Sequence, residues 1–207
     1  MSSHADRMAS LFLYKGDCLT GLSAAGKAHP GPIRIPDGVR CIGEAAFRKC
    51  EHIRRVFLPD SVTEIGPQAF SECTGLTEVR LPTSLLHIPP AAFFGCASLA
   101  ALTLPPSLDR IEGMAFWGCS RLSGVSLPET LRLLGERAFY QCTALDRLHL
   151  PSGLLRMGAF ALAGCLALSA VTYGGSMADW AGMDRSARWK DYDRPCVVRC
   201  TDGEVRL

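Results

Sequence analysis

Hydrophobic and polar residues follow a pattern along this chain that repeats every 23 residues. Proline recurs at this interval six times, from Pro36 to Pro151, and no insertion or deletion breaks the register. Three further columns keep the same interval: an aliphatic column (Ile42, Ile65, Ile88, Ile111, Leu134, Met157), a mostly phenylalanine column (Phe47, Phe70, Phe93, Phe116, Phe139, Leu162) and a cysteine column (Cys50, Cys73, Cys96, Cys119, Cys142, Cys165). A fixed period of this length indicates a repeat architecture.

Each copy contains one short strand. In the stretch LTEVRLP, residues 76–82, Val79 and Leu81 alternate with polar residues, which predicts a strand with one buried face. Proline ends this strand because it has no N–H to donate to a neighbour. The later segment Ile65–Cys73 is too short for a full helix, so it predicts a 3-10 or irregular turn around the phenylalanine.

The copies must stack, because a single copy cannot bury its own apolar side chains. The sequence therefore predicts a repeat solenoid with one parallel sheet of short strands, in six to seven coils. At the usual strand spacing of about 4.8 Å, six coils form a rod of roughly 30 Å.

The repeat resembles the BspA-type leucine-rich repeats of bacterial surface and commensal proteins. The stretch LPDSVTEIGPQAFSECTGLTEVRLP, residues 58–82, matches the family pattern almost position by position, and the resemblance extends over 33–173. It implies a right-handed leucine-rich repeat coil there, an N-terminal tail and hairpin cap at 1–32, and a C-terminal cap with a Trp-bearing helix at 174–207. Glu112 replaces the usual glycine and Leu162 replaces phenylalanine, which predicts looser packing of the last copy.

The C-terminal cap carries a helix signal. Ser176 and Asp179 stand in the S-x-x-D spacing of a capping box, which predicts a helix over about 177–183. We expect Trp180, Met183 and Met177 to face the last coil and close its open edge. The alternative is that Trp180 is an exposed anchor for a ligand.

The cysteine column predicts core packing rather than chemistry. Equivalent side chains in a solenoid are parallel, which does not favour the converging geometry of a disulfide or of a zinc site. A buried thiol behaves as a small apolar group, so we expect all six to be buried and reduced. Cys196 and Cys200 have no metal-binding spacing and are interpreted as incidental thiols; nothing in the pattern pairs Cys18 with Cys41.

Catalytic and cofactor motifs are missing from the sequence. The stretch GLSAAGK, residues 21–27, has the glycine and lysine spacing of a phosphate-binding loop, but Ala28 replaces the hydroxyl that would hold Mg²⁺. Prolines at 30 and 32 forbid the long helix that should follow, so we interpret the stretch as the turn of the hairpin cap. Acidic residues stand at variable repeat positions that are typical of a solvated face. We therefore predict no enzyme, no cofactor and no metal, although strand-rich solenoids can carry paired catalytic carboxylates.

Composition and charge limit the classes of partner and the location that the sequence predicts. The chain has 207 residues, 48% apolar, with a net charge of +2, which gives no electrostatic footprint for a nucleic acid. No run of 18 apolar residues predicts a membrane span, and the N-terminus has no secretory signal. The sequence as it stands predicts a monomer in the cytoplasm. The alternative is a cell-surface or secreted protein whose N-terminus is incomplete.

The predicted strands present two outward rows on the concave face of the solenoid. We expect a ligand to contact eight of these residues: Arg55, Phe57, Glu78, Arg80, Thr103, Ser126, Arg147 and His149. Phe57 is either a contact for a partner or is covered by the N-terminal hairpin.

Two functions remain open. The first is a non-enzymatic module that binds a protein or peptide, or a glycoconjugate, on the concave face, as the resemblance implies. The second is a structural spacer domain of an adhesin-like surface protein with no ligand of its own.

Overall fold

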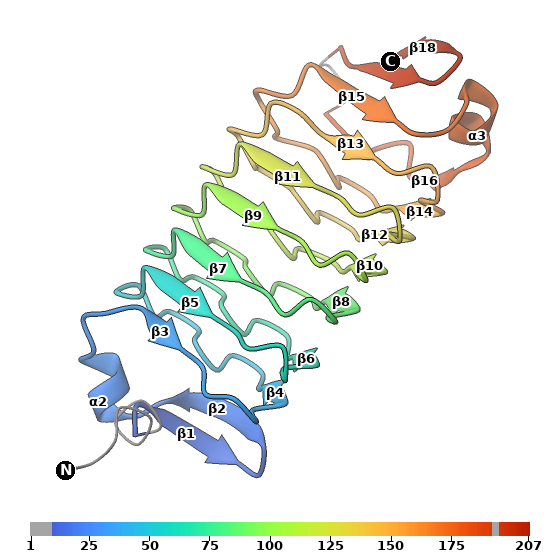
Figure 1. Cartoon of the computed structure of the whole chain (residues 1–207). Coiled ribbons are helices and arrows are strands. Elements are labelled where there is room, and N and C mark those ends of the chain that lie inside the picture. Colours follow the sequence, from blue (N-terminus) through green and yellow to red (C-terminus); the bar gives the residue numbers. More distant parts are fainter. Residues whose placement is uncertain (1–9, 192–194) are drawn as a thin grey trace.

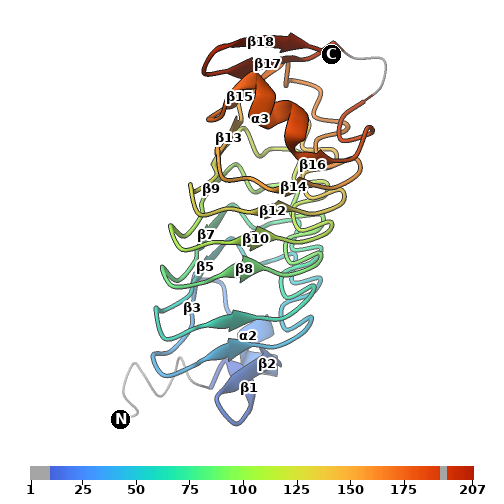
Figure 2. The same ribbon diagram turned by 90° about the vertical axis from the view of Figure 1, so that its right-hand side faces the viewer.

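The protein is a solenoid in which successive coils stack along one axis (Figure 1). The computed structural model describes residues 10–191 and 195–207, so the first nine residues of the predicted N-terminal tail lie outside it. Each coil has three sides: a strand, a second and shorter strand, and a run of irregular turns (Figure 2). The predicted repeat solenoid is confirmed, but it has about eight coils rather than the six to seven that were predicted, because the cap segments add coils beyond the six copies.

The first side of the coil carries the strands that the sequence predicted. These strands run parallel and in register, with only the last one antiparallel: β3 (Ile33–Arg34), β5 (Arg55–Phe57), β7 (Glu78–Arg80), β9 (Ala101–Thr103), β11 (Gly124–Ser126), β13 (His149–Leu150), β15 (Ala170–Tyr173), β17 (Val197–Cys200) and β18 (Gly203–Arg206). Hydrogen bonding divides them into the sheets β3-β5-β7, β9-β11 and β13-β15-β17-β18. An isolated bridge between Gly124 and Arg147 links the last two sheets.

A second row of strands was not predicted, because the sequence analysis expected one parallel sheet. It contains β2 (Cys18–Leu22), β4 (Cys41–Ile42), β6 (Glu64–Ile65), β8 (His87–Ile88), β10 (Arg110–Ile111), β12 (Leu133–Leu134), β14 (Arg156–Met157) and β16 (Asp184–Arg185). Apart from β2, the strands of this row have two residues each, too few to show an alternating pattern in the sequence. The row is interrupted between β6 and β8. Gly66 donates its N–H to the coil before it, but the equivalent residue one coil later is Pro89, which has no N–H to donate.

The third side of the coil is also hydrogen-bonded from coil to coil. The N–H of Phe93 donates to Ala115 O at 2.8 Å, and that of Gly95 donates to Trp117 O at 2.7 Å. This ladder requires a left-handed backbone at two positions in each coil. The first position carries Ala45, Gln68, Ala91, Met114, Arg137 and Phe160; the second carries Lys49, Glu72, Gly95, Gly118, Gln141 and Gly164.

The core is a column of phenylalanine rings along the solenoid axis. The rings of Phe47, Phe70, Phe93, Phe116 and Phe139 are fully buried and stack nearly parallel, with centroids 5.1–5.4 Å apart. Offset stacking of this kind adds about 0.5–1.5 kcal/mol per pair beyond the burial of apolar area. Leu162 ends the column, as the sequence indicates, and is still buried.

The cysteine column packs beside these rings, and five of its six thiols are buried as predicted. Each buried thiol also donates to the carbonyl of the phenylalanine one coil back: Cys73 to Phe47, Cys96 to Phe70, Cys119 to Phe93, Cys142 to Phe116 and Cys165 to Phe139, at 3.0–3.2 Å. The prediction is wrong for Cys50, which is half-buried. Cys50 belongs to the first copy, so no phenylalanine carbonyl of an earlier copy lies below it.

The N-terminal end is closed by an antiparallel hairpin of β1 (Phe12–Lys15) and β2. The stretch 21–27 is not the turn of this hairpin, as the sequence analysis expected. Gly21 and Leu22 belong to β2, and α2 (Ala24–Lys27) forms a single helical turn capped by Ser23. The side chain of Ser23 accepts the N–H of Gly26 and caps this helical turn. The turn ends at Lys27, so the prolines at 30 and 32 do not prevent it.

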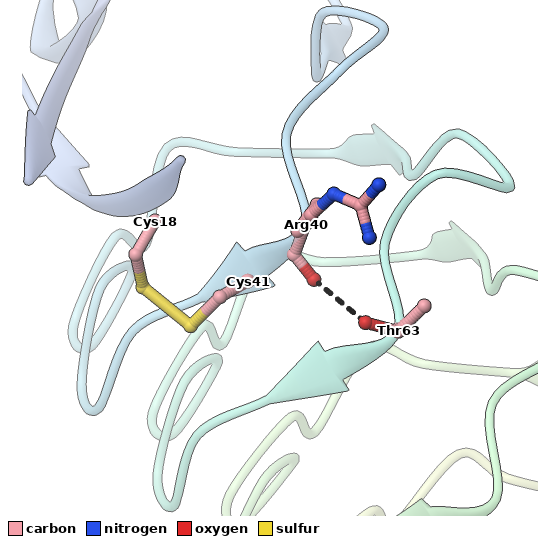
Figure 3. The surroundings of a disulfide bond; sticks show 4 residues. All are labelled: Cys18, Arg40, Cys41 and Thr63. Carbon is pink, nitrogen blue, oxygen red and sulfur yellow. Dashed lines mark hydrogen bonds between the residues drawn. A yellow bond between two sulfur atoms is a disulfide. The ribbon is translucent and has the colours of Figure 1, made fainter. Parts of the chain in front are cut away.

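A disulfide between Cys18 and Cys41 joins this hairpin to the first coil (Figure 3). No pairing of these residues was predicted, and the expectation that parallel in-register side chains do not favour a disulfide is wrong for this pair. Cys18 and Cys41 are register partners on β2 and β4, and their Cα atoms are 4.4 Å apart. The neighbouring strands β2 and β4 therefore bring these two cysteines within disulfide range, whereas the thiols of the cysteine column stay free.

The C-terminal end is closed by α3 (Met177–Gly182), whose predicted capping box is present. Ser176 Oγ accepts the N–H of Asp179 at 3.1 Å, and a carboxylate oxygen of Asp179 accepts the N–H of Ser176 at 2.8 Å. Trp180 and Met183 are buried, as cap packing predicts, but Met177 is exposed and its predicted inward position is wrong. Burial excludes the alternative in which Trp180 is an exposed ligand anchor.

Candidate functional site

The structure places the eight predicted contact residues in two rows on the first side of the coils. Register pairs Arg55 with Glu78 and Phe57 with Arg80. It also pairs Thr103 with Ser126, while Arg147 and His149 follow in the next coil. Seven of these side chains are exposed, and Phe57 is half-buried.

The N-terminal half of this face is hollowed. A cavity of about 510 Å³ lies over β5, β7 and β9, with Phe57, Glu78 and Arg80 at one end and Thr103 with Pro106 at the other. Phe57 is not covered by the N-terminal hairpin. The guanidinium of Arg34, one coil earlier, lies 4.5 Å from the centre of its ring and covers it in a cation–π contact.

The C-terminal half contains a second hollow with a different character. A cavity of about 620 Å³ is lined by Ser126, Arg147, His149 and Arg199, among others. His149 Nδ1 lies 3.0 Å from the hydroxyl of Thr172, and its Nε2 lies 3.6 Å from a carboxylate oxygen of Glu129. Arg147, with 91% of its side chain exposed, is held only by a 3.7 Å contact with Asp146.

Gly124 lines both hollows, which therefore meet at this position; the two hollows together are called the trough. A Cβ atom added at Gly124 would meet no atom within 4 Å, so the floor of the trough is open at this point. The trough therefore has a neutral middle, an aromatic and charged N-terminal end, and a C-terminal end where Arg147 and Arg199 pair with Asp146 and Glu204. An extended chain fits this shape better than a compact small molecule.

A carboxylate at the rim of the first hollow is held in place by hydrogen bonds. Asp60 accepts hydrogen bonds from the backbone N–H and the hydroxyl of Thr83, at 2.9 and 3.1 Å. These bonds favour the ionised form and lower the pKa of Asp60 below its usual value. Asp60 therefore shapes the loop beside the trough.

Two cationic side chains at the trough were not predicted: Arg34 covers the ring of Phe57, and Arg199 lines the second hollow. Arg34 stands 23 residues before Phe57, so the periodicity contained the signal for it. Arg199 pairs with Thr172 on β15 but lies 27 residues after it, outside the 23-residue register. Only the structure reveals this second contact.

Metal binding finds no support on this surface. Over residues 10–191 and 195–207, no cluster of three or more His, Cys, Asp or Glu side chains is arranged to hold an ion. Within the same residues, no helix is long and apolar enough to cross a membrane.

The sequence matches the BspA type leucine-rich repeat region in six copies, over residues 31–125 and 63–181. The chain belongs to the BspA-type leucine-rich repeat family. The resemblance in the repeat pattern is thereby confirmed.

Solved structures agree with this assignment. A leucine-rich repeat protein of T. pallidum is 31% identical over 82% of this chain and 86% of its own, with a TM-score of 0.71. A leucine-rich repeat protein of Bacteroides ovatus is 28% identical over 78% of this chain, with a TM-score of 0.70; the match spans 44% of that protein. A leucine-rich cell surface protein of Faecalibacterium prausnitzii is 26% identical over 81% of this chain and 38% of its own, with a TM-score of 0.57. No curated protein sequence matches the chain.

Proposed function

We propose that this chain is a non-enzymatic binding module that holds an extended protein segment in the trough on its concave face. The observation that carries the proposal is that the two hollows share Gly124 in their lining, so that together they extend from β5 to β17. A protein segment supplies both the apolar side chain for the Phe57 end and polar groups for the other end, where Arg147 contacts Asp146 and Arg199 contacts Glu204.

The distribution of carboxylates supports binding rather than hydrolysis. Glu78 lines the first hollow and Asp146 lines the second, where it contacts Arg147. Hydrolysis by paired carboxylates needs the two groups to face one another across a bond. The lining residues of the trough hold one carboxylate in each hollow instead.

We infer that the protein works as a monomer at the cell surface or after secretion, rather than in the cytoplasm. The disulfide between Cys18 and Cys41 supports this location, because such bonds persist in oxidising compartments. The leucine-rich cell surface protein of Faecalibacterium prausnitzii has a related fold and supports the same inference. Fractionation of the native organism followed by non-reducing mass spectrometry tests it: a cytoplasmic, fully reduced chain would contradict the inference.

A random linear peptide library displayed on phage provides the test of the trough. Peptides enriched on the wild-type protein are synthesised, and their affinity is measured by fluorescence anisotropy against Gly124→Trp. Because position 124 is open and free of a left-handed backbone, the indole fills the trough without disturbing the coil. We expect the affinity to fall about tenfold or more.

Gly182→Trp is the matched control. Gly182 is equally open but lies at the end of α3, away from the trough, so this variant should bind like the wild type. Peptides that bind Gly124→Trp as tightly as the wild type would refute the trough as the site. A library with no enriched peptide would favour the alternative function, a structural spacer without a ligand of its own.

A further inference from the structure

A stripe of aromatic side chains runs along the turn side of the coils, outside the trough. Phe94, Trp117 and Tyr140 occupy the same position in three consecutive coils. Their ring centroids are 5.4 and 4.8 Å apart, with interplanar angles of 58° and 66°. All three are half-buried, so each ring keeps part of its surface open to solvent.

The fold does not require aromatic residues at this position. The equivalent residues in the other copies are Arg48, Ser71 and Ala163, and these copies form the same turns. The neighbouring core column is different, because it is phenylalanine in every coil from Phe47 to Phe139. Three half-buried aromatics that packing does not demand indicate a contact surface.

Small and planar groups surround the rings. Gly95 and Gly118 follow Phe94 and Trp117 directly, and a Cβ added at either glycine would come no closer than 3.7 Å to another atom. They leave a strip of bare backbone beside the stripe. Gln141 Oε1 accepts the indole N–H of Trp117 at 3.2 Å, which leaves the amide NH₂ of Gln141 as a donor at the rim.

A guanidinium extends the stripe. The Arg137 group lies 5.8 Å from the centre of the Trp117 ring and 5.1 Å from that of Phe160. Its charge is balanced by an ion pair with Glu136. The surface is therefore aromatic and nearly neutral, with planar hydrogen-bond donors beside the rings.

These features decide between the linear polymers that could lie along the axis. A peptide strand would need free backbone donors, but the N–H groups of Gly95 and Gly118 already donate to Trp117 O and Tyr140 O of the next coil. A polyanion would need unpaired cations, and Arg137 is paired. A neutral polysaccharide needs neither, because its C–H faces pack on aromatic rings and its hydroxyls accept from amide and guanidinium groups.

We propose that this stripe is a second binding site, which holds a neutral linear glycan along the solenoid axis with one sugar ring for each coil. The site is separate from the trough and does not depend on the function proposed for it. Glycan lies on the turn side, while the concave face stays free for a protein segment.

Intrinsic fluorescence tests the proposal directly. The chain has three tryptophans, and Trp180 and Trp189 are only 1% and 4% exposed. Trp117 therefore reports ligands that reach the surface. Titration with cellohexaose and maltohexaose, two neutral linear glycans of different linkage, should give a saturable change in emission with at least one of them. No saturable change with either would overturn the proposal.

Variants measured by calorimetry locate the site. Trp117→Ala and Tyr140→Ala should each weaken glycan binding about tenfold or more, and Trp117→Phe should retain more affinity than Trp117→Ala because it keeps a ring. Circular dichroism melts confirm that each variant is folded. Gly124→Trp, which blocks the trough, should bind glycan like the wild type; equal losses from Gly124→Trp and Trp117→Ala would place the glycan elsewhere.

Two further probes settle the ligand class. A sulfated polyanion that binds the stripe while both neutral glycans fail would overturn the assignment to a neutral glycan. A peptide from the phage selection would also overturn this assignment if it bound Trp117→Ala more weakly than the wild type but bound Gly124→Trp equally well.

Discussion

The middle of the solenoid and its two ends are held together by different means. In the middle, each coil repeats the contacts of the coil before it: a stacked phenylalanine, a thiol donating to a carbonyl, and hydrogen-bonded ladders. Each end uses a device that occurs once. The N-terminal hairpin is joined to the first coil by the Cys18–Cys41 disulfide. At the C-terminal end, the ring of Trp180 packs edge-on against Tyr173 and Trp189, with centroids 5.5 and 5.7 Å apart.

The difference follows from the number of neighbours. A middle coil has a partner on both sides, so ordinary apolar side chains suffice to bury it. A terminal coil has one partner and would otherwise expose its core and its strand edge. Covalent or large aromatic groups compensate for the missing neighbour.

The largest expected effect comes from breaking the middle of the phenylalanine column. Phe93 stacks on Phe70 and Phe116, whereas Leu162 contacts the column from one side only. Phe93→Ala should therefore lower the free energy of unfolding by about 4 kcal/mol and Leu162→Ala by about 2 kcal/mol. Urea denaturation measures both. Equal losses would mean that the coils do not depend on their neighbours as the stacked rings imply.

The next effect concerns the N-terminal end. The disulfide closes a loop across a sequence separation of 23 residues, for which loss of chain entropy in the unfolded state predicts a stabilisation of about 3 kcal/mol. The double variant Cys18→Ser, Cys41→Ser should lose this amount in urea denaturation. A reducing agent should cause the same loss in the wild type and none in the double variant. If the reducing agent did not change the stability of the wild-type protein, the stabilising role of the disulfide would be contradicted.

Two cysteines of the same column compare the middle with an end. Cys96 is buried and donates to Phe70 O at 3.1 Å, while Cys50 is half-buried and lies 3.9 Å from Arg48 O in its own coil. Cys96→Ala should cost about 1–2 kcal/mol, since it leaves a cavity and removes a donor, and Cys50→Ala should cost less than about 0.5 kcal/mol. Chemical denaturation of both variants measures the difference.

The same thiols predict a loss of stability at alkaline pH. Burial raises the pKa of the Cys96 and Cys165 thiols from 9.0 to about 12, so the folded protein keeps them neutral when the unfolded chain has ionised its own. Their contribution is fully present below pH 9 and is lost as the pH rises from 9 toward 12. Cys96→Ala should flatten the slope of stability against pH in this range, and Cys50→Ala should change it less.

How far the sequence predicts this structure also divides between middle and ends. Residues that recur, such as the phenylalanine column, the concave rows and Arg34, are visible in the periodicity. Features that occur once, such as the disulfide, the helical turn α2 and Arg199, have no copy to reveal them. The capping box of α3 is an exception, because its signal is local and complete within four residues. The aromatic stripe was not predicted from the sequence, because only three of the six copies have an aromatic residue at this position.

The smallest expected effect tests the turn side, where the backbone is the same in every coil but the residues differ. Gly118 has φ 73° and Met114 has φ 60°, and both lie in the left-handed region. A Cβ at Gly118 would meet its nearest atom at 3.7 Å, so Gly118→Ala suffers no clash and costs only the conformational penalty, about 1 kcal/mol. Met114→Gly removes that penalty but adds entropy to the unfolded chain, which leaves a net gain of about 0.5 kcal/mol. Thermal melts of the two variants should shift in opposite directions. A Met114→Gly variant that melts below the wild type would mean that the side chain of Met114 contributes more than its backbone costs.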